Sequence, residues 1–134
     1  MRTDLTIIIP LYNSEKTILE AISSIEKEKI NLNYEVIIVD DCSTDNSLRL
    51  VENKINNYSN YKLFKNQKNL GGGATRNIAI KNSNSDVIYC LDSDNMIGEG
   101  SIEKMFNLLK DKNVDGVTVH KSKRFMDSLK NGSY

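Results

Sequence analysis

Three nearly continuous runs of aliphatic and β-branched residues constrain the fold of this chain more than any other feature. They are "LTIIIP" (5–10), "YEVIIVD" (34–40) and "DVIYCLD" (86–92). Strands covered by helices on both faces have this composition, whereas a strand with one solvated face alternates apolar and polar residues. "DGVTVH" (115–120) is a fourth candidate and "YKLFKN" (61–66) a weaker fifth. The runs predict a sheet that is buried on both faces.

Amphipathic helical patterns separate the predicted strands. Ser14 is placed to cap a first helix, and Ser43 or Thr44 to start a second. A third begins after the glycines at 71–73 and a fourth near Ser101. This alternation predicts an α/β fold of three layers (α/β/α) around a mostly parallel sheet. The apolar stripes of the four helices are Ile18, Leu19, Ile22 and Ile25; Leu48, Val51 and Ile55; Ala74, Ile78 and Ala79; and Ile102, Met105, Phe106 and Leu109.

The bulk composition excludes several classes of partner. A length of 134 residues suits one domain, and 18 basic residues balance 18 acidic ones. Binding to nucleic acid is therefore not expected, and ligands must be held by local chemistry. No apolar stretch approaches the roughly 20 residues that span a bilayer. We expect Cys42 and Cys90 to be reduced, Cys90 to fill core space, and the protein to be cytoplasmic or peripheral at the inner face of a membrane.

Polar residues gather after three of the predicted strands. Because the carboxyl ends of parallel strands share one edge of a sheet, these clusters are predicted to meet over a common crevice. Helix capping accounts for Ser43, Thr44 or Asp45, but neighbouring carboxylates at 40 and 41 repel each other and need another explanation. The clusters are Pro10, Tyr12, Asn13 and Glu15; Asp40, Asp41, Ser43, Thr44 and Asp45; and Asp92, Ser93, Asp94 and Asn95.

Asp92 and Asp94 flank Ser93 at the end of an apolar run. Taken alone, the pair is typical of a solvated acidic turn. Beside two other polar clusters it favours a site for a hard divalent cation, Mg²⁺ or Mn²⁺, which binds carboxylates, keeps several waters and is completed by substrate phosphates. The two-residue spacing is expected to turn both carboxylates toward the crevice.

The segment "NLGGGATRNIAI" (69–80) combines glycines with the start of a helix. Gly72 and its neighbours let a ligand approach the backbone before a helix N-terminus, which favours anions. Arg76, in the first turn, can bind a phosphate or a neighbouring carboxylate. A P-loop is excluded because Gly-Lys-Ser/Thr is absent, and no GxGxxG dinucleotide fingerprint follows the first strand.

Four stretches together resemble the family 2 glycosyltransferases, nucleotide-diphospho-sugar enzymes with the GT-A fold. They are "TIIIPLYNSEKTILEAISSI", "YEVIIVDDCSTDNS", "NLGGGATRNIAI" and "DVIYCLDSDNMI", in the family's order and spacing over about residues 4 to 97. The resemblance implies metal-dependent transfer of a sugar from a nucleotide-diphosphate sugar, most commonly a UDP-sugar, to an acceptor hydroxyl. It also implies an inverting reaction and a place in cell-surface polysaccharide synthesis.

The resemblance further implies which residues bind the donor. Asp41 is similar to the aspartate that hydrogen-bonds the base, and Arg76 to the arginine near the base and diphosphate. Asp92, Ser93 and Asp94 match the DxD motif, in which Asp94 is the more direct ligand of Mn²⁺ or Mg²⁺ and Asp92 lies nearer the ribose or sugar. The full implied donor site is Pro10, Tyr12, Asn13, Glu15, Asp40, Asp41, Gly72, Arg76, Asp92, Ser93 and Asp94.

One departure limits what the resemblance implies. Family catalytic domains continue well beyond the DxD motif, and that part supplies the acceptor site and the general base, whereas here about forty residues follow Asp94. Glu99, Glu103, Asp111 and Asp115 are available acids, but none matches the motif of that base. The chain is expected to be a truncated, donor-binding half of a transferase. A non-catalytic nucleotide-sugar-binding module is the alternative, and the acceptor and any homo-oligomer stay open.

The predicted domain spans residues 1–120, and a basic tail or the start of a missing acceptor half follows at 121–134. His120, the only histidine, ends the last predicted strand, where a partly solvated position is favoured over a metal or phosphate contact. The basic residues Lys121, Lys123 and Arg124 indicate a solvated tail more than a site for an anionic surface.

Overall fold

The computed structural model describes residues 2–111 and 115–116, and it divides into two compact units, Met1–Glu99 and Gly100–Tyr134. The helix α4 (Ser101–Asp111) belongs to the second unit and all other helices and strands to the first. Of the predicted strand at 115–120, only Asp115 and Gly116 are described, and neither is in a strand. His120, the basic tail and the expected boundary at residue 120 lie outside the described residues.

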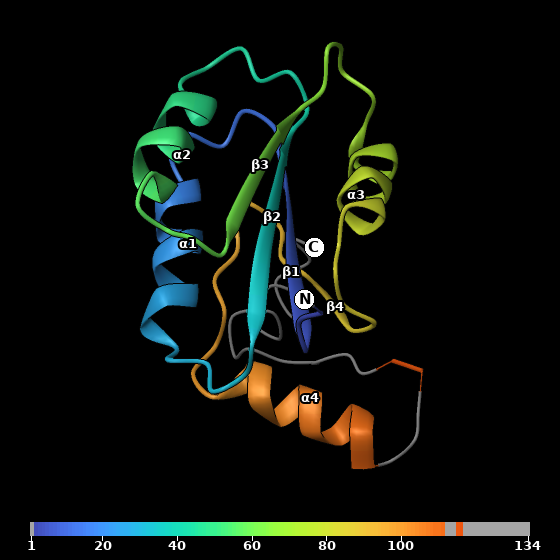
Figure 1. Ribbon diagram of the computed structural model, residues 1–134. Coiled ribbons are helices and arrows are strands. Elements are labelled where there is room, and N and C mark those ends of the chain that lie inside the picture. The colour runs from blue at the N-terminus through green and yellow to red at the C-terminus, as the bar shows by residue number, and fades with distance from the viewer. Residues whose placement is uncertain (1, 112–114, 117–134) are drawn as a thin grey trace, which may run out of the picture. The chain divides into compact units, whose positions relative to one another are not determined.

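The first unit is built on a sheet of four parallel strands in the order β3-β2-β1-β4 (Figure 1). In the register, Ile8 of β1 lies between Ile37 of β2 and Cys90 of β4. The predicted parallel sheet is confirmed, and the weaker candidate at 61–66 is an edge strand. The strand bounds are β1 (Leu5–Leu11), β2 (Tyr34–Asp40), β3 (Tyr61–Lys65) and β4 (Ile88–Cys90).

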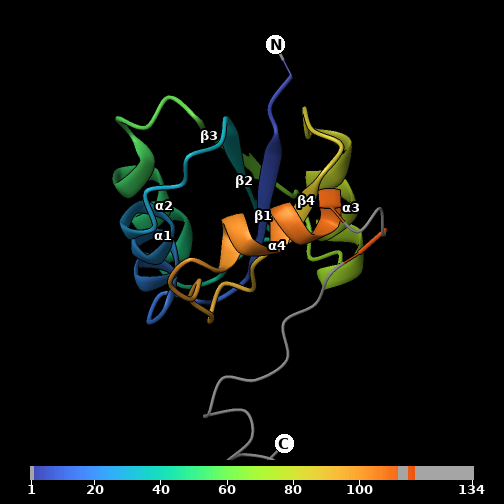
Figure 2. The same ribbon diagram turned by 90° about the horizontal axis from the view of Figure 1, so that it is seen from below.

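Helices cover both faces of this sheet, so the predicted three layers are confirmed. α1 (Ile18–Lys27) and α2 (Ser47–Ile55) pack beside each other on one face, and α3 (Gly72–Lys81) lies against β1 and β2 on the other (Figures 1 and 2).

The core explains why the strand sequences are apolar without alternation. Ile8, Ile37 and Val39 pack with Ala79 of α3. Because side chains alternate along a strand, Ile7 and its register partner Val36 point to the opposite face of the sheet. All these side chains are buried, and burial of each aliphatic side chain contributes roughly 1.5–3 kcal/mol. A strand between two helical layers therefore has apolar residues at most positions, and Thr6 and Glu35 are buried polar exceptions.

The third predicted strand, 86–92, is only partly correct. Regular pairing is confined to β4, Ile88–Cys90, which pairs with β1 alone among the described strands. The prediction that Cys90 fills the core is wrong, because this edge position leaves it exposed. Among the described residues, no helix is long and apolar enough to cross a membrane.

The predicted caps Ser14, Ser43 and Thr44 are wrong, whereas Asp45 does accept an N–H group at the start of a helix. The Ile18 N–H at the start of α1 donates to the backbone carbonyl of Ser14, not to its hydroxyl. α2 begins at Ser47, after both predicted start residues, and the Ser47 N–H donates to Asp45 Oδ1 at 2.9 Å. The Ser14 hydroxyl contacts the Ser93 hydroxyl, and Asp45 also accepts the Glu15 N–H, so both groups join one loop to another.

Candidate functional site

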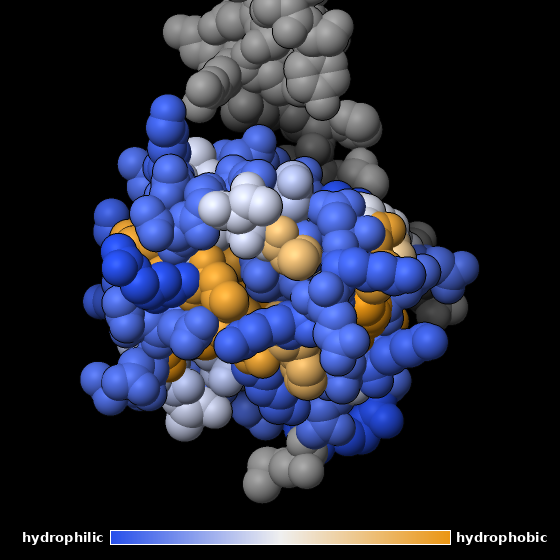
Figure 3. All heavy atoms as spheres, turned by 90° about the horizontal axis from the view of Figure 1, so that it is seen from above, coloured by the Kyte–Doolittle hydropathy of each residue, from blue (hydrophilic) through white to orange (hydrophobic). Residues whose placement is uncertain are grey.

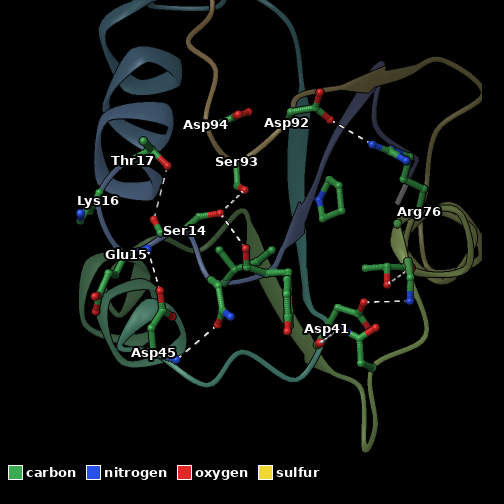
Figure 4. A pocket seen from close by; sticks show the side chains of 18 residues that line it. Ser14, Glu15, Lys16, Thr17, Asp41, Asp45, Arg76, Asp92, Ser93 and Asp94 are labelled. Carbon is green, nitrogen blue, oxygen red and sulfur yellow. Dashed lines mark hydrogen bonds and ion pairs between the residues drawn. The ribbon is translucent and has the colours of Figure 1, made fainter.

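A hollow of about 890 Å³ lies at the carboxyl ends of the strands, where the loops after β1, β2 and β4 converge with the start of α3. We call it the strand-end hollow. This face of the molecule is mainly hydrophilic, with hydrophobic surface visible near its middle (Figure 3). The lining residues are Pro10, Leu11, Tyr12, Asn13, Ser14, Glu15, Lys16, Thr17, Asp41, Asp45, Asn69, Gly71, Gly72, Thr75, Arg76, Asp92, Ser93 and Asp94 (Figure 4).

The loop after β1 is fastened to the loop after β2 by polar contacts. Asn13, at φ 45°, accepts the N–H groups of Thr44 (2.8 Å) and Asp45 (3.3 Å) with its Oδ1. The Glu15 N–H donates to Asp45 Oδ2, and Glu15 Oε2 accepts the Asn46 N–H at 3.1 Å. Asn13 and Glu15 thus line the strand-end hollow while their side-chain oxygens hold the neighbouring loop.

Asp41 is a buried carboxylate that fixes where α3 begins. Its Oδ1 accepts the Leu70 N–H (2.7 Å) and the Asn66 amide (2.9 Å), and its Oδ2 accepts the Gly71 N–H (2.9 Å). Burial acts to raise the pKa of this carboxyl, but the hydrogen bonds from Leu70, Asn66 and Gly71, with Thr75 close by, outweigh it and leave the pKa below its ordinary value. The group is therefore held in its charged form.

Asp40, although next to Asp41, does not line the strand-end hollow. Its carboxylate accepts the hydroxyl (2.6 Å) and the N–H (3.3 Å) of Ser43. Successive residues at a strand end point to opposite sides, so the two carboxylates have separate partners and do not share a site. Repulsion between them, which the sequence suggested, is avoided by geometry.

Gly71 precedes α3 with φ 91°, a conformation that favours glycine. Its carbonyl accepts both the N–H (3.0 Å) and the hydroxyl (2.7 Å) of Thr75. The Asn66 amide also contacts the Thr75 hydroxyl at 3.2 Å. The first turn of α3 is therefore anchored from β2 and from within.

The predicted carboxylate pair lies beyond β4, in a turn closed by the bond from the Asn95 N–H to the Asp92 carbonyl. Asp92 Oδ1 is 3.1 Å from Arg76 Nη2, and both side chains are substantially exposed (Figure 4). The hydroxyls of Ser93 and Ser14 are 2.5 Å apart, which ties this turn to the loop after β1. Among the described residues, the Asp94 carboxylate has neither a hydrogen-bond nor an ion-pair partner.

The charges around the strand-end hollow suit a cation. Within the described part of the chain, no three His, Cys, Asp or Glu side chains are grouped to hold a metal ion by themselves. Two carboxylates, Asp92 and Asp94, nevertheless face the hollow, and oxygen donors in this number fit a Mg²⁺ or Mn²⁺ ion that takes its other ligands from water and phosphates. Acidic side chains outnumber basic ones in the lining, so an anionic ligand would need added positive charge.

A general base is not identified in the strand-end hollow. Of the acids considered from the sequence, Glu99 belongs to the first unit but does not line the hollow, and Glu103, Asp111 and Asp115 belong to the second unit.

Sequence reasoning missed several lining residues and supports of the hollow. Asp45 was assigned to helix capping because it lies two residues before α2. Its second contact, with the Glu15 N–H in the loop after β1, could not be inferred from that position. Thr75 and Asn66 carry no motif, and only their separation of nine residues around a glycine run offers a weak signal. The other missed lining residues are Leu11, Ser14, Lys16, Thr17 and Asn69.

The family model described as Glycosyl transferase family 2 matches residues 6–133, nearly the whole chain. The chain belongs to glycosyl transferase family 2. Structural comparison agrees: the crystal structure of Staphylococcus aureus TarS 1–349 in complex with UDP-GlcNAc superposes with a TM-score of 0.75 at 32% identity. That match covers 89% of this chain and 37% of TarS 1–349, and it confirms the GT-A fold.

Several curated relatives are named as glycosyltransferases that act on poly(ribitol-phosphate). This chain is 39% identical over 100 residues to the S. aureus poly(ribitol-phosphate) beta-N-acetylglucosaminyltransferase TarS, over 73% of this chain and 17% of the relative. It is 37% identical over 121 residues to a poly(ribitol-phosphate) beta-glucosyltransferase of Bacillus spizizenii, over 89% of this chain and 19% of the relative. The family 2 chain thus spans less than a fifth of the length of these relatives.

Proposed function

We propose that this chain forms the donor-binding part of a glycosyltransferase that uses a UDP-sugar. The observation that carries the proposal is the convergence of Arg76, Asp92 and Asp94 with the loop after β1 in one hollow. Membership of family 2 and similarity to TarS structures in complex with UDP and UDP-GlcNAc support it. By the same similarity, we propose a role in making a cell-surface polymer.

Within the proposed donor site, Pro10 and the exposed ring of Tyr12 offer apolar surface to a base. Arg76 is placed to donate to diphosphate oxygens, and Asp94, with Asp92, to bind a divalent cation. A Mg²⁺ or Mn²⁺ ion bound there would offset the negative charge that develops on the leaving diphosphate.

The proposed reaction is an inverting displacement. The acceptor hydroxyl oxygen forms a bond to the anomeric carbon, the bond from that carbon to the diphosphate oxygen breaks, and UDP leaves with the bonding electrons. The hydroxyl proton passes to a general base. The described lining of the hollow places no carboxylate that we assign to this step.

Substitution of the least engaged carboxylate tests the donor and metal proposals together. We expect Asp94→Ala to weaken Mn²⁺-dependent UDP binding by about 30-fold or more, measured by calorimetry, because one of two carboxylate ligands is lost. Asp86→Ala is the control: this aspartate is exposed at the start of the β4 segment and pairs with Arg2. The metal site would be refuted if Asp94→Ala, and the unmodified protein in EDTA, bound UDP as tightly as the unmodified protein does with Mn²⁺. Failure of the unmodified protein to bind UDP would refute the donor site.

A non-catalytic nucleotide-sugar-binding module is the second candidate, favoured because no carboxylate in the described lining of the strand-end hollow is assigned as the general base. Transfer and donor-hydrolysis assays distinguish the two. UDP binding without turnover supports a module, whereas metal-dependent release of the sugar supports the enzyme.

A further inference from the structure

We propose that Gly72 is a positioning residue for Arg76: its missing side chain leaves the space in which the guanidinium folds back over the first turn of α3 and reaches Asp92. This inference deepens the function proposed above and rests on it, because all three residues line the strand-end hollow.

The guanidinium occupies the place that a side chain at Gly72 would need. A Cβ at this position would lie 3.1 Å from Arg76 Nη1, 3.8 Å from Cζ and 4.0 Å from Nη2. Residues four apart on a helix lie on the same face, so the long side chain of Arg76 passes directly above Gly72. The shortest of these contacts is tighter than ordinary van der Waals contact, so a methyl group would require the guanidinium to shift by a few tenths of an ångström.

The displacement matters because the other side of the guanidinium is already in use. Arg76 Nη2 is 3.1 Å from Asp92 Oδ1, across the strand-end hollow from the start of α3 (Figure 4). A hydrogen bond of this length weakens as the donor moves away, since N–H···O distances extend only to about 3.2 Å. Asp92 therefore holds the guanidinium on one side, and Gly72 leaves room for it on the other.

The helix itself cannot readily move to make room. Asp41 accepts the Leu70 and Gly71 N–H groups, and the Gly71 carbonyl accepts two bonds from Thr75. Because these contacts anchor the first turn of α3, an added methyl at Gly72 would act on the exposed and flexible end of Arg76.

Electrostatics makes this position sensitive to small changes. The N-terminus of α3 carries partial positive charge, which disfavours a cation folded back toward it. Asp92 offsets that repulsion. We therefore expect the small shift required by a methyl group at residue 72 to weaken the contact of Arg76 with Asp92 and with a diphosphate.

Gly73 provides a matched control. A Cβ at Gly73 meets no heavy atom within 4 Å, and Gly73 does not line the hollow. Gly72 and Gly73 are both helical and neither has a positive φ, so alanine improves helix propensity equally at the two positions. A difference between the two alanine variants reports on the space above Gly72.

The test is a mutant cycle in UDP binding, measured by calorimetry with Mn²⁺. We expect Gly73→Ala to change the Kd less than about twofold and Gly72→Ala to weaken binding about five- to tenfold. In an Arg76→Ala background, Gly72→Ala should have no further effect, because the displaced group is gone. Equal effects of the two alanine variants would overturn the proposal. A full effect that persists without Arg76 would also overturn it, and would indicate direct obstruction of the ligand.

A ligand-free measurement separates failure of this inference from failure of the proposed function. The ¹³C chemical shift of the Asp92 carboxyl should change in Gly72→Ala and stay unchanged in Gly73→Ala, in protein that urea unfolding shows to be folded. If the unmodified protein binds no UDP, the proposed function fails while this measurement still tests the positioning. If it binds UDP and both variants leave the Asp92 signal unchanged, only the role of Gly72 fails.

Discussion

A buried carboxylate lies at the amino ends of the strands and another at their carboxyl ends. Comparing them shows which contacts stabilise the fold and which support the candidate site. Glu35, near the amino ends of the strands, accepts the Thr6 hydroxyl (2.7 Å), the Asn84 N–H (2.5 Å) and the Lys62 ammonium (3.0 Å). Asp41, at the carboxyl ends, accepts two N–H groups and an amide instead.

The partners of the two carboxylates differ in what they lead to. Glu35 and its partners do not line the strand-end hollow, and they join three strands and the segment before β4 to one another. Two partners of Asp41, Leu70 and Gly71, immediately precede α3, and that helix presents Arg76 to the hollow. The same physical device, a buried charge satisfied by donors, stabilises the sheet at one edge and positions a binding loop at the other.

The largest effect is expected when the hydrogen bonds around Glu35, at the amino ends of the strands, are removed. Glu35→Ala should lower the free energy of unfolding by about 3 kcal/mol in urea titration, because the Thr6 hydroxyl and the Asn84 N–H lose a charged acceptor. UDP affinity should be unchanged. Glu20→Ala, at an exposed position of α1, is the control. A weakened UDP affinity in folded Glu35→Ala would show that the two edges are coupled.

Asp41→Asn should have a smaller effect on stability than Glu35→Ala, but it should also weaken ligand binding in the strand-end hollow. The new amide would face the Gly71 N–H with a donor, so we expect a loss of about 2 kcal/mol in the free energy of unfolding. Faster hydrogen exchange at residues 70–76 and weaker UDP binding should accompany it. Normal UDP binding despite the stability loss would remove Asp41 from the support of the site.

Acid should act on both edges in the same direction. For Glu35 as for Asp41, burial acts to raise the pKa, but hydrogen bonds outweigh it and the net pKa is lowered. The stabilisation is therefore complete above the unfolded-state pKa values, near pH 4, and is lost as pH falls through the lower folded values.

As pH falls from 4 to 3, we expect the free energy of unfolding to decrease by about 1 kcal/mol more in the unmodified protein than in the Glu35→Gln, Asp41→Asn double variant. Urea titration across this range measures the difference. Parallel pH profiles would show that other groups control the acid response.

The smallest effect is expected at the exposed ion pair of Arg76 and Asp92. Because both side chains are solvated, the pair is screened, and Asp92→Asn should change the free energy of unfolding by less than about 0.5 kcal/mol. Thermal or urea unfolding measures this directly. A loss comparable to that of Glu35→Ala would place Asp92 among the groups that stabilise the fold.

The strands and most helix faces were predictable because their signals are local, although Leu19 and Ala74 of the predicted stripes are exposed. Continuous apolar runs such as 34–40 identify buried parallel strands, and spacings of three or four residues identify the buried face of a helix. The 86–92 run was misjudged because the same apolar composition occurs at a sheet edge, where Cys90 is exposed. Composition shows that a strand is apolar but not how many neighbours it has.

The candidate site was predictable as a set of loops but less so in its contacts. Parallel topology brings the loops after β1, β2 and β4 to one edge, so the convergence of Tyr12, Asp41 and Asp92 followed from strand order. The separate partners of Asp40 and Asp41, and the use of Asn13 to hold the next loop, depend on side-chain directions that local sequence does not specify.

The sequence by itself determined the α/β layering, the parallel sheet and the resemblance to family 2, since each depends on residue order, spacing or hydrophobic period. The tertiary structure decided which carboxylates face the strand-end hollow, and it placed Arg76 over Gly72 and beside Asp92. These outcomes depend on contacts between segments distant in the chain, and such contacts form only when the sheet brings its loops together.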